Sequence, residues 1–227
     1  MKTLTLLFLI LTLISCGKSG DGSSAPVATS DISTGVAANN ESNTGTDVSL
    51  EEIAEQEVVP SAALNFDVKV DLTNFNATQE DKILEASDLI RKVIASDEFK
   101  NAILNHKVNG KRRFVDNGGL SNAQIYKKII EGSEKLKPGK DNEMDLELEV
   151  YREASNTVGY TYPSINKVFM NAKFLNSNKP YEVTTNMTHE WLHKLGFKHA
   201  QQKTPSRKYS VPYAVGYIMR KLSKKNG

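Results

Sequence analysis

The feature that most constrains this chain is the run at residues 189–199, which spells H-E-x-x-H-x-x-G-x-x-H. On a helix, side chains at positions i and i+4 share one face, so His189 and His193 can reach one ion. Gly196 lacks a Cβ and tolerates the left-handed conformation that ends a helix, which lets the chain turn and bring His199 to the same ion. The spacing therefore predicts a helix that ends near Gly196 and three imidazoles around one point.

Three imidazoles that leave one coordination position open are typical of a catalytic zinc ion. We expect one Zn²⁺, with Glu190 beside it as the general base. A purely structural zinc site fits poorly, because such sites usually have four protein ligands, often cysteines, and Cys16 is the only cysteine of the chain. The fourth histidine, His106, has polar neighbours and is predicted to be an exposed loop or helix-end residue.

The sequence after the motif bears on the third ligand. A bare H-E-x-x-H could take that ligand from a downstream acidic residue, but residues 200–227 contain neither Asp nor Glu, so His199 is expected to fill this position. The same stretch could bind anionic lipid, cell-wall polymer or nucleic acid, although a solvated surface is the commoner role of such charges and no nucleic-acid partner is expected. Its basic residues are Lys203, Arg207, Lys208, Arg220, Lys221, Lys224 and Lys225.

The N-terminus predicts where the protein works. Lys2 precedes an apolar run at residues 4–13, which is typical of a signal peptide and too short to span a bilayer. Residues 13–16 resemble the lipobox of bacterial lipoproteins, which implies cleavage after residue 15 and lipidation of Cys16. We expect a lipid anchor in the cell envelope, on the bacterial outer membrane or cell surface, facing the periplasm or the exterior. The alternative is a plain secretory signal with an incidental cysteine.

Composition divides the rest of the chain into two parts. Residues 16–60 carry the predicted lipidation site and a stretch rich in Ser, Gly, Ala, Thr and Asn, which predicts a disordered tether. The tether holds eight acidic side chains against Lys18 alone, so residues 61–227 are left with a net charge near +8. That second part has the length of one domain, and we expect a single catalytic domain that acts as a monomer.

Periodicity within residues 61–227 alternates between strand and helix. Apolar residues at every second position predict a strand at 64–72, and helical spacing follows at 79–95, with Thr78 and Asp81 as a capping pair. A short helix at 99–104 and a helix between Ser121 and Gly132 come next, separated by glycine-rich loops. Three further strands are predicted at 144–151, 157–162 and 165–174, and the helix that carries His189 is expected to start at Thr184 or Thr185.

With its motif and this strand order, the chain resembles the metzincin metalloendopeptidases. The resemblance implies an α+β (mixed α/β) fold with a twisted mixed sheet, an active-site helix and a small C-terminal subdomain. It also implies an antiparallel edge strand that binds an extended peptide, although an ordinary interior strand is an equal alternative. The residues of this strand would be Val158, Gly159, Tyr160, Thr161 and Tyr162.

The resemblance also concerns the residues after the motif. Metzincins have a methionine in a tight turn below the metal, and Met219 is the only methionine after residue 199. Helical spacing of its neighbours gives the alternative that Met219 is a core residue of a closing helix. Some metzincins carry a tyrosine two residues after that methionine, where this chain has Lys221, so Tyr213 or Tyr217 could stabilise the oxyanion instead. Latency through a cysteine bound to the zinc is not expected, because Cys16 is the predicted lipid site.

These expectations lead to one function and one alternative. The expected function is a zinc-dependent endopeptidase that hydrolyses peptide bonds of peptide or protein substrates, anchored to the cell envelope. The alternative is a non-catalytic surface lipoprotein that uses a metzincin-like body to bind a partner. The presence of Glu190 favours catalysis, because a binding module does not need a general base beside an open metal site.

Overall fold

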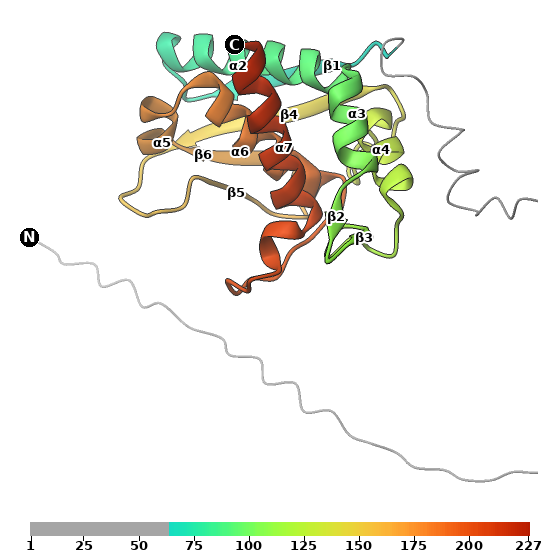
Figure 1. Cartoon of the computed structure of the whole chain (residues 1–227). Coiled ribbons are helices and arrows are strands. Elements are labelled where there is room, and N and C mark those ends of the chain that lie inside the picture. The colour runs from blue at the N-terminus through green and yellow to red at the C-terminus, as the bar shows by residue number, and fades with distance from the viewer. Residues whose placement is uncertain (1–63) are drawn as a thin grey trace, which may run out of the picture. The chain divides into compact units, whose positions relative to one another are not determined.

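A four-stranded sheet with the order β1-β4-β6-β5 organises the fold. The computed structural model describes residues 64–227 (Figure 1). Strands β1 (Asp67–Thr73), β4 (Glu143–Tyr151) and β6 (Lys167–Asn171) are parallel, and β5 (Gly159–Thr161) is antiparallel to β6 at one edge. The predicted mixed sheet and its antiparallel edge strand are therefore confirmed. A crossover containing a helix connects β1 to β4, as parallel neighbours require.

Helices precede and follow the strands of this sheet, as Figure 1 shows. They are α2 (Ala77–Ile94), α3 (Asp97–Leu104), α4 (Asn122–Glu131), α5 (Ala172–Ser177), α6 (Pro180–Lys194) and α7 (Val211–Asn226). A short 3₁₀ turn, η2 (Arg207–Tyr209), comes directly before α7. Strands β2 (Lys107–Val108) and β3 (Lys111–Arg112) form a hairpin around Asn109 and Gly110, which both have positive φ. The described part of the chain is thus a mixed α/β fold.

Only one face of the sheet is covered by the core. Along β4, alternate side chains are buried and the residues between them are acidic or polar, as a half-buried strand requires. Helix α6 adds Met187, Trp191 and Leu192 to this core, and α7 adds Val215 and Met219. The residues after the motif therefore share the main core, and the small C-terminal subdomain that we expected is not confirmed.

Several predicted boundaries are wrong by a few residues. Helix α2 is capped by Asn76 and Gln79 rather than by Thr78 and Asp81. The strand predicted at 165–174 ends at Asn171, because the Asn171 side chain accepts a hydrogen bond from the Lys173 amide and caps α5. In contrast, Ser121 and Gly132 start and end α4 as predicted.

Helix α6 also differs from its prediction at the N-terminal end. It begins at Pro180 instead of Thr184 or Thr185, and Glu182 accepts a hydrogen bond from the Lys179 amide. Proline at the first helical position loses no hydrogen bond, because the first amide groups of a helix have no partner within it.

The predicted signal peptide (residues 1–15), the lipidation site Cys16 and the tether (residues 16–60) lie outside the described residues. All described residues belong to one compact unit. Within residues 64–227, no helix combines the length and the apolar content that crossing a membrane requires.

Candidate metal centre

Helix α6 ends in a turn that returns the chain to the helix face carrying His189 and His193. The Gly196 amide donates to the His193 carbonyl and the Phe197 amide to the Leu192 carbonyl, both at 3.0 Å, which is the Schellman pattern of a helix C-terminus. Gly196 has a φ of +95°, and a Cβ on it would lie 2.3 Å from Lys135 Cε. The predicted role of Gly196 is confirmed, and this turn brings His199 to the other two histidines.

The three histidines of the motif form one cluster. One ring nitrogen of each lies within 4.8 Å of the others, and Nε2 of His189 is 3.3 Å from Nε2 of His199. Two nitrogens that bind one tetrahedral zinc at about 2.0–2.1 Å are separated by about 3.3 Å, so the spacing fits a shared ion. The cluster is therefore a group that could bind a metal ion.

Backbone carbonyls orient the histidine rings from the opposite side. His193 Nδ1 lies 2.8 Å from the Phe197 carbonyl oxygen, and His199 Nδ1 lies 3.0 Å from that of Ala200. For His189 the backbone partner is Pro212, at the start of α7. A proton on Nδ1 that is donated to a carbonyl leaves the Nε2 lone pair for a metal, so the ring orientations also fit this use.

Burial keeps two of these rings neutral. It lowers the pKa of His189 to about 3, assisted by the neighbouring charges of His193 and His199 when these are protonated. Burial likewise lowers the pKa of His193. A metal ligand must be the neutral imidazole, so this environment favours the form that binds metal.

Glu190 lies on the side of α6 that faces β5. Its side chain is 5% exposed, and burial raises its pKa to about 7, partly opposed by Lys194. The Asn186 amide, one helical turn earlier, donates to Glu190 Oε1 at 3.5 Å. Asn186 also lies against Gly159 of β5, where an added Cβ would be 2.5 Å from Asn186 Oδ1. The carboxyl group therefore lies beside the edge strand, on the residue that follows His189.

Lys194 connects the end of α6 to the segment that joins β5 and β6. Its Nζ donates to the carbonyls of Tyr162 and Lys167, each at 3.3 Å, and to the Ile165 carbonyl. Burial lowers the pKa of Lys194 to about 8. Together with the contact of Asn186 and Gly159, these bonds hold β5 alongside the row formed by Asn186, Glu190 and Lys194, which recurs every four residues.

Helix α7 places a tyrosine on the histidine cluster. The ring centroid of Tyr213 lies 4.5 Å from that of His189 and 4.8 Å from that of His199. Tyr217 lies one turn further, is 50% exposed, and its ring centroid is 6.3 Å from that of Tyr213. Of the two candidates, the structure thus brings Tyr213 to the site and leaves Tyr217 beside it.

Met219 does not lie in a tight turn, so that prediction is wrong. It is a fully buried residue within α7, and the Ser223 hydroxyl donates to its sulfur at 3.5 Å. Gly216 makes the close approach between α7 and α6 instead, because a Cβ there would lie 3.8 Å from His189 Cβ and 3.3 Å from the Thr185 carbonyl oxygen. The alternative, a core methionine in a closing helix, is confirmed.

Two contacts that hold α6 in place were not predicted from the sequence. The Trp191 indole donates to Glu134 Oε1, and the Lys135 amide donates to the Lys194 carbonyl at 2.9 Å. Both contacts join the loop after α4 to α6, and no local sequence pattern indicates such long-range pairs. The row of Asn186, Glu190 and Lys194 could have been found, since its spacing of four residues is visible in the sequence.

His106 is not the exposed residue that was predicted. It follows α3 directly, as expected of a helix-end residue, but its ring stacks on Phe114 with centroids 4.1 Å apart, and burial lowers its pKa. It belongs to none of the groups in the described chain that could hold a metal.

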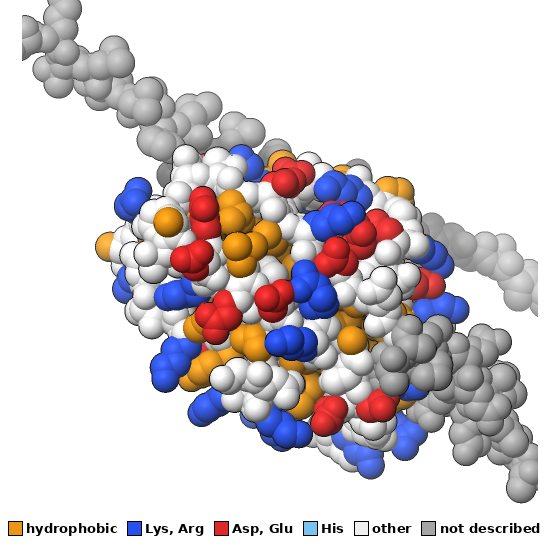
Figure 2. Space-filling model, turned by 90° about the horizontal axis from the view of Figure 1, so that it is seen from above, with side chains coloured by type: hydrophobic (Ala, Val, Ile, Leu, Met, Phe, Trp, Pro, Cys, Tyr) orange, Lys and Arg blue, Asp and Glu red, His pale blue; other side chains and the backbone are white. Residues whose placement is uncertain are grey.

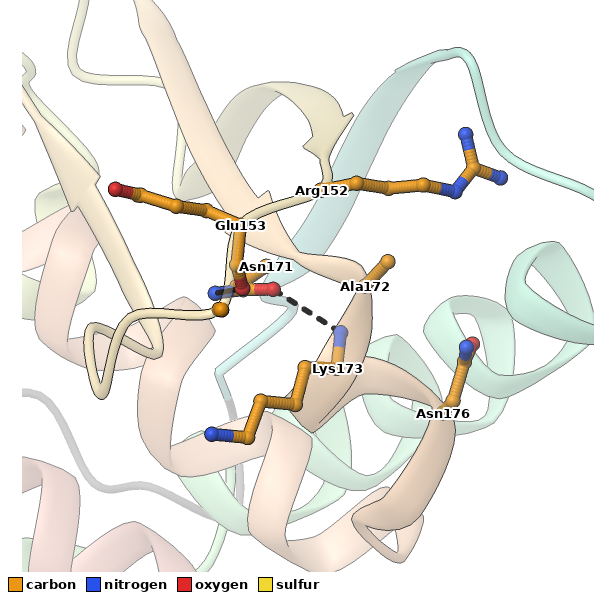
Figure 3. Close-up of a pocket in the computed structure, with 7 residues that line it drawn as sticks. Arg152, Glu153, Asn171, Ala172, Lys173 and Asn176 are labelled. Carbon is orange, nitrogen blue, oxygen red and sulfur yellow. Dashed lines mark hydrogen bonds between the residues drawn. The ribbon is translucent and has the colours of Figure 1, made fainter.

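A pocket of about 500 Å³ at the ends of β4 and β6 is separate from the histidines (Figure 3). Arg152 and Lys173 line it and extend away from each other, as Figure 3 shows. The Asn171 amide donates to the carbonyls of Glu153 and Thr157 at 3.1 and 3.2 Å. The Asn171 side chain is therefore already hydrogen-bonded, and the two basic side chains point in different directions. The pocket has no set of polar groups directed at one ligand position.

A second acidic group, Asp141, Glu143 and Asp145, also lies close enough together to hold a cation. Glu143 already pairs with Lys69 at 2.5 Å, and Asp145 has Lys137 at 3.9 Å. These pairs occupy the carboxylates, so the histidine cluster is the stronger candidate.

The basic residues after His199 have partners on different elements. Arg220 pairs with Glu182 of α6, Lys225 pairs with Glu98 of α3 at 3.4 Å, and Lys224 lies over the Tyr181 ring. On the face shown in Figure 2, acidic and basic side chains are likewise interspersed. These observations favour a solvated surface over one basic binding area.

Comparison of the chain with models of known protein families gives no match. Comparison with curated proteins gives no match either. The site is therefore interpreted from its own geometry.

Proposed function

We propose that this protein is a zinc-dependent endopeptidase of metzincin-like design. The observation that carries the proposal is the cluster of three imidazoles on and just after α6, the same helix on which the buried Glu190 lies on the side that faces β5. Imidazole is a suitable ligand for zinc as well as for copper, iron and nickel. Three imidazoles with an open fourth position are typical of catalytic zinc. When bound, zinc supplies a Lewis acid that activates water and polarises a carbonyl group. His189, His193 and His199 would hold it.

Glu190 moves the proton in this proposal. Its carboxylate accepts a proton from the attacking water and then donates it to the nitrogen of the leaving amine. A pKa of about 7 suits both roles at neutral pH, since the group can accept and release a proton at little cost. Asn186 orients the carboxyl group through its bond to Oε1.

The edge strand β5 would hold the substrate. An edge strand has backbone N–H and C=O groups without a partner strand, and an extended peptide can add to it by the same bonds that join sheet strands. Because Asn186 and Lys194 hold β5 alongside Glu190, a peptide bound there would pass the catalytic carboxyl group. In this proposal Tyr213, whose ring packs on His189, donates a hydrogen bond to the carbonyl oxygen as negative charge develops on it.

The proposal includes an anchor in the cell envelope through a lipid on Cys16, as the sequence of residues 13–16 indicates. A surface lipoprotein that only binds a partner is the competing function. It is less well supported, because burying a carboxyl group beside three histidines is costly and gives a binding module no benefit.

The test is peptide hydrolysis by the full-length, zinc-loaded protein and its Glu190→Gln variant. Loss of the base should lower kcat by about 10²–10⁴-fold, whereas zinc stoichiometry should stay unchanged because the ligands remain. Glu85→Gln, an exposed change of the same kind on α2, is the matched control and should keep full activity. Equal turnover by Glu190→Gln and the wild type would overturn the assigned role, and a wild type that cleaves no peptide library would favour the binding function.

A further inference from the structure

Arg207 is an arginine at the metal centre that neither the motif nor the proposed mechanism uses. Its guanidinium carbon lies 4.8 Å from the ring centroid of Tyr213, whose ring in turn packs on His189 and His199. The positive charge of Arg207 acts on His189 and on His193, where it opposes protonation. The guanidinium therefore lies over the tyrosine that packs on the histidine cluster, and η2 and the first turn of α7 carry these two residues.

This guanidinium has no acceptor in the described part of the chain. Its Nε is buried and has no hydrogen-bond partner among residues 64–227, and no described carboxylate forms an ion pair with it. Arg91 and Arg220, in contrast, pair with Asp67 and Glu182. Residues 200–227 also contain no acidic side chain that could reach it locally. A buried donor without a partner is unfavourable, so this position is suited to an acceptor that arrives with a ligand.

The acceptor that fits is a carboxylate. A guanidinium offers parallel N–H donors in a planar fork that matches the two oxygens of a carboxylate. Stacking on Tyr213 restricts the side chain, and Arg207 as a whole is only partly buried. The local charge is also favourable, since the neighbouring residues Lys198, Lys203 and Lys208 are basic.

We propose that Arg207 binds a carboxylate of the substrate close to the scissile bond, so that the site selects peptides with an acidic side chain or a free C-terminus there. This inference rests on the proposed peptidase function and names its substrate class. Arg207 would act as a specificity-determining residue, and Tyr213 would position it.

The experiment measures binding separately from turnover. Full-length, zinc-loaded protein with Glu190→Gln is titrated with three fluorescent peptides of equal length: one neutral with an amidated C-terminus, one with a glutamate and an amidated C-terminus, and one neutral with a free C-terminus. Peptides with the glutamate placed at successive positions cover the possible registers. At least one carboxylate-bearing peptide should bind about tenfold or more tightly than the neutral one, and which peptide does so identifies the source of the carboxylate.

Arg207→Gln should remove this difference and leave the affinity for the neutral peptide unchanged, and Arg207→Lys should restore part of it. Lys208→Gln is the matched control, because it also removes one positive charge, at the next residue of the chain. The Lys208 side chain lies over Tyr209 and not over Tyr213, so this variant should retain the preference. Zinc content and thermal unfolding of each variant show that the site is intact. A role limited to packing on Tyr213 would change these two properties without changing the ratio of peptide affinities.

In the titrations, the inference is overturned by equal affinity for all peptides or by a carboxylate preference that persists in Arg207→Gln. Cleavage of the same peptides by the wild type separates this result from the proposed function. If the wild type cleaves neutral and acidic peptides equally well, the inference fails and the peptidase function stands. If it cleaves none while carboxylate binding depends on Arg207, the peptidase function fails and the binding site stands. Absence of both binding and cleavage would overturn both.

Discussion

At the candidate metal centre, burial shifts the pKa values of individual residues more than the charges of their neighbours do. Burial is the largest contribution to the lowered pKa of His189 and to the raised pKa of Glu190. Both shifts favour the neutral form, because removing a charge from water costs free energy. The same environment thus keeps an imidazole free to bind metal and gives a carboxyl group a pKa near neutrality.

At this scale we predict that His199→Ala weakens zinc binding more than about 100-fold, because it removes a direct ligand and even indirect partners of ligands contribute about 10–100-fold. Equilibrium dialysis at controlled free zinc measures the change. His106→Ala removes a histidine outside the cluster and should keep the wild-type affinity. Stoichiometric zinc in His199→Ala at the wild-type affinity would show that another group is the third ligand.

Among the elements, the contact of α6 with β5 determines whether the edge strand lies beside the Glu190 carboxyl group. Asn186 and Lys194 make this contact from two turns of one helix face. Lys194 is 6% exposed and is shared among three backbone carbonyls of the β5–β6 segment. Two side chains of one helix face therefore position the proposed substrate strand, and Lys194 contributes all of the hydrogen bonds named here.

We predict that Lys194→Met loosens β5 without removing the metal ligands. Backbone carbonyls left without a donor should cost about 1–3 kcal/mol, so amides of residues 159–162 should exchange hydrogen faster, and KM for peptides should rise more than kcat falls. Lys127→Met, on the exposed face of α4, is the control and should change neither quantity. Unchanged exchange at β5 would show that Lys194 does not hold the strand.

For the whole molecule, stability is linked to groups that connect distant segments through the core. Glu134 accepts hydrogen bonds from the Trp191 indole and the Asp145 amide, and thereby joins the loop after α4 to α6 and β4. Burial raises the pKa of Glu134 above its ordinary value of 4.5, opposed by these hydrogen bonds. The folded chain then binds more protons than the unfolded chain between the two pKa values, so Glu134 lowers the free energy of unfolding as pH rises through this range.

Glu134→Gln should remove this dependence, because glutamine keeps an oxygen acceptor for Trp191 and does not titrate. The difference in free energy of unfolding between variant and wild type should therefore shift in favour of the variant as pH rises from about 4.5 through the raised pKa of Glu134, measured by urea denaturation at constant zinc. Glu85→Gln controls for the loss of one carboxylate from the surface. A difference that is independent of pH would contradict the buried, titrating role of Glu134.

Features that depend on neighbours within one or two turns of the chain could be predicted from the sequence. The spacing of His189 and His193, the left-handed turn at Gly196 and the caps Ser121 and Gly132 are local, and each agrees with the structure. Alternation along β4 is local as well, because successive side chains of a strand face opposite sides.

The distant groups that meet at that site are seen in the tertiary structure and could not be predicted from the sequence. Packing of α7 on α6 put Tyr213 and Gly216 against His189 and moved Met219 into the core, although a tight turn was expected at that methionine. Arg207 and Lys194 acquired their surroundings in the same way. The physical reason is that burial and long-range hydrogen bonds depend on how elements pack, and one helical or extended pattern is compatible with many packings.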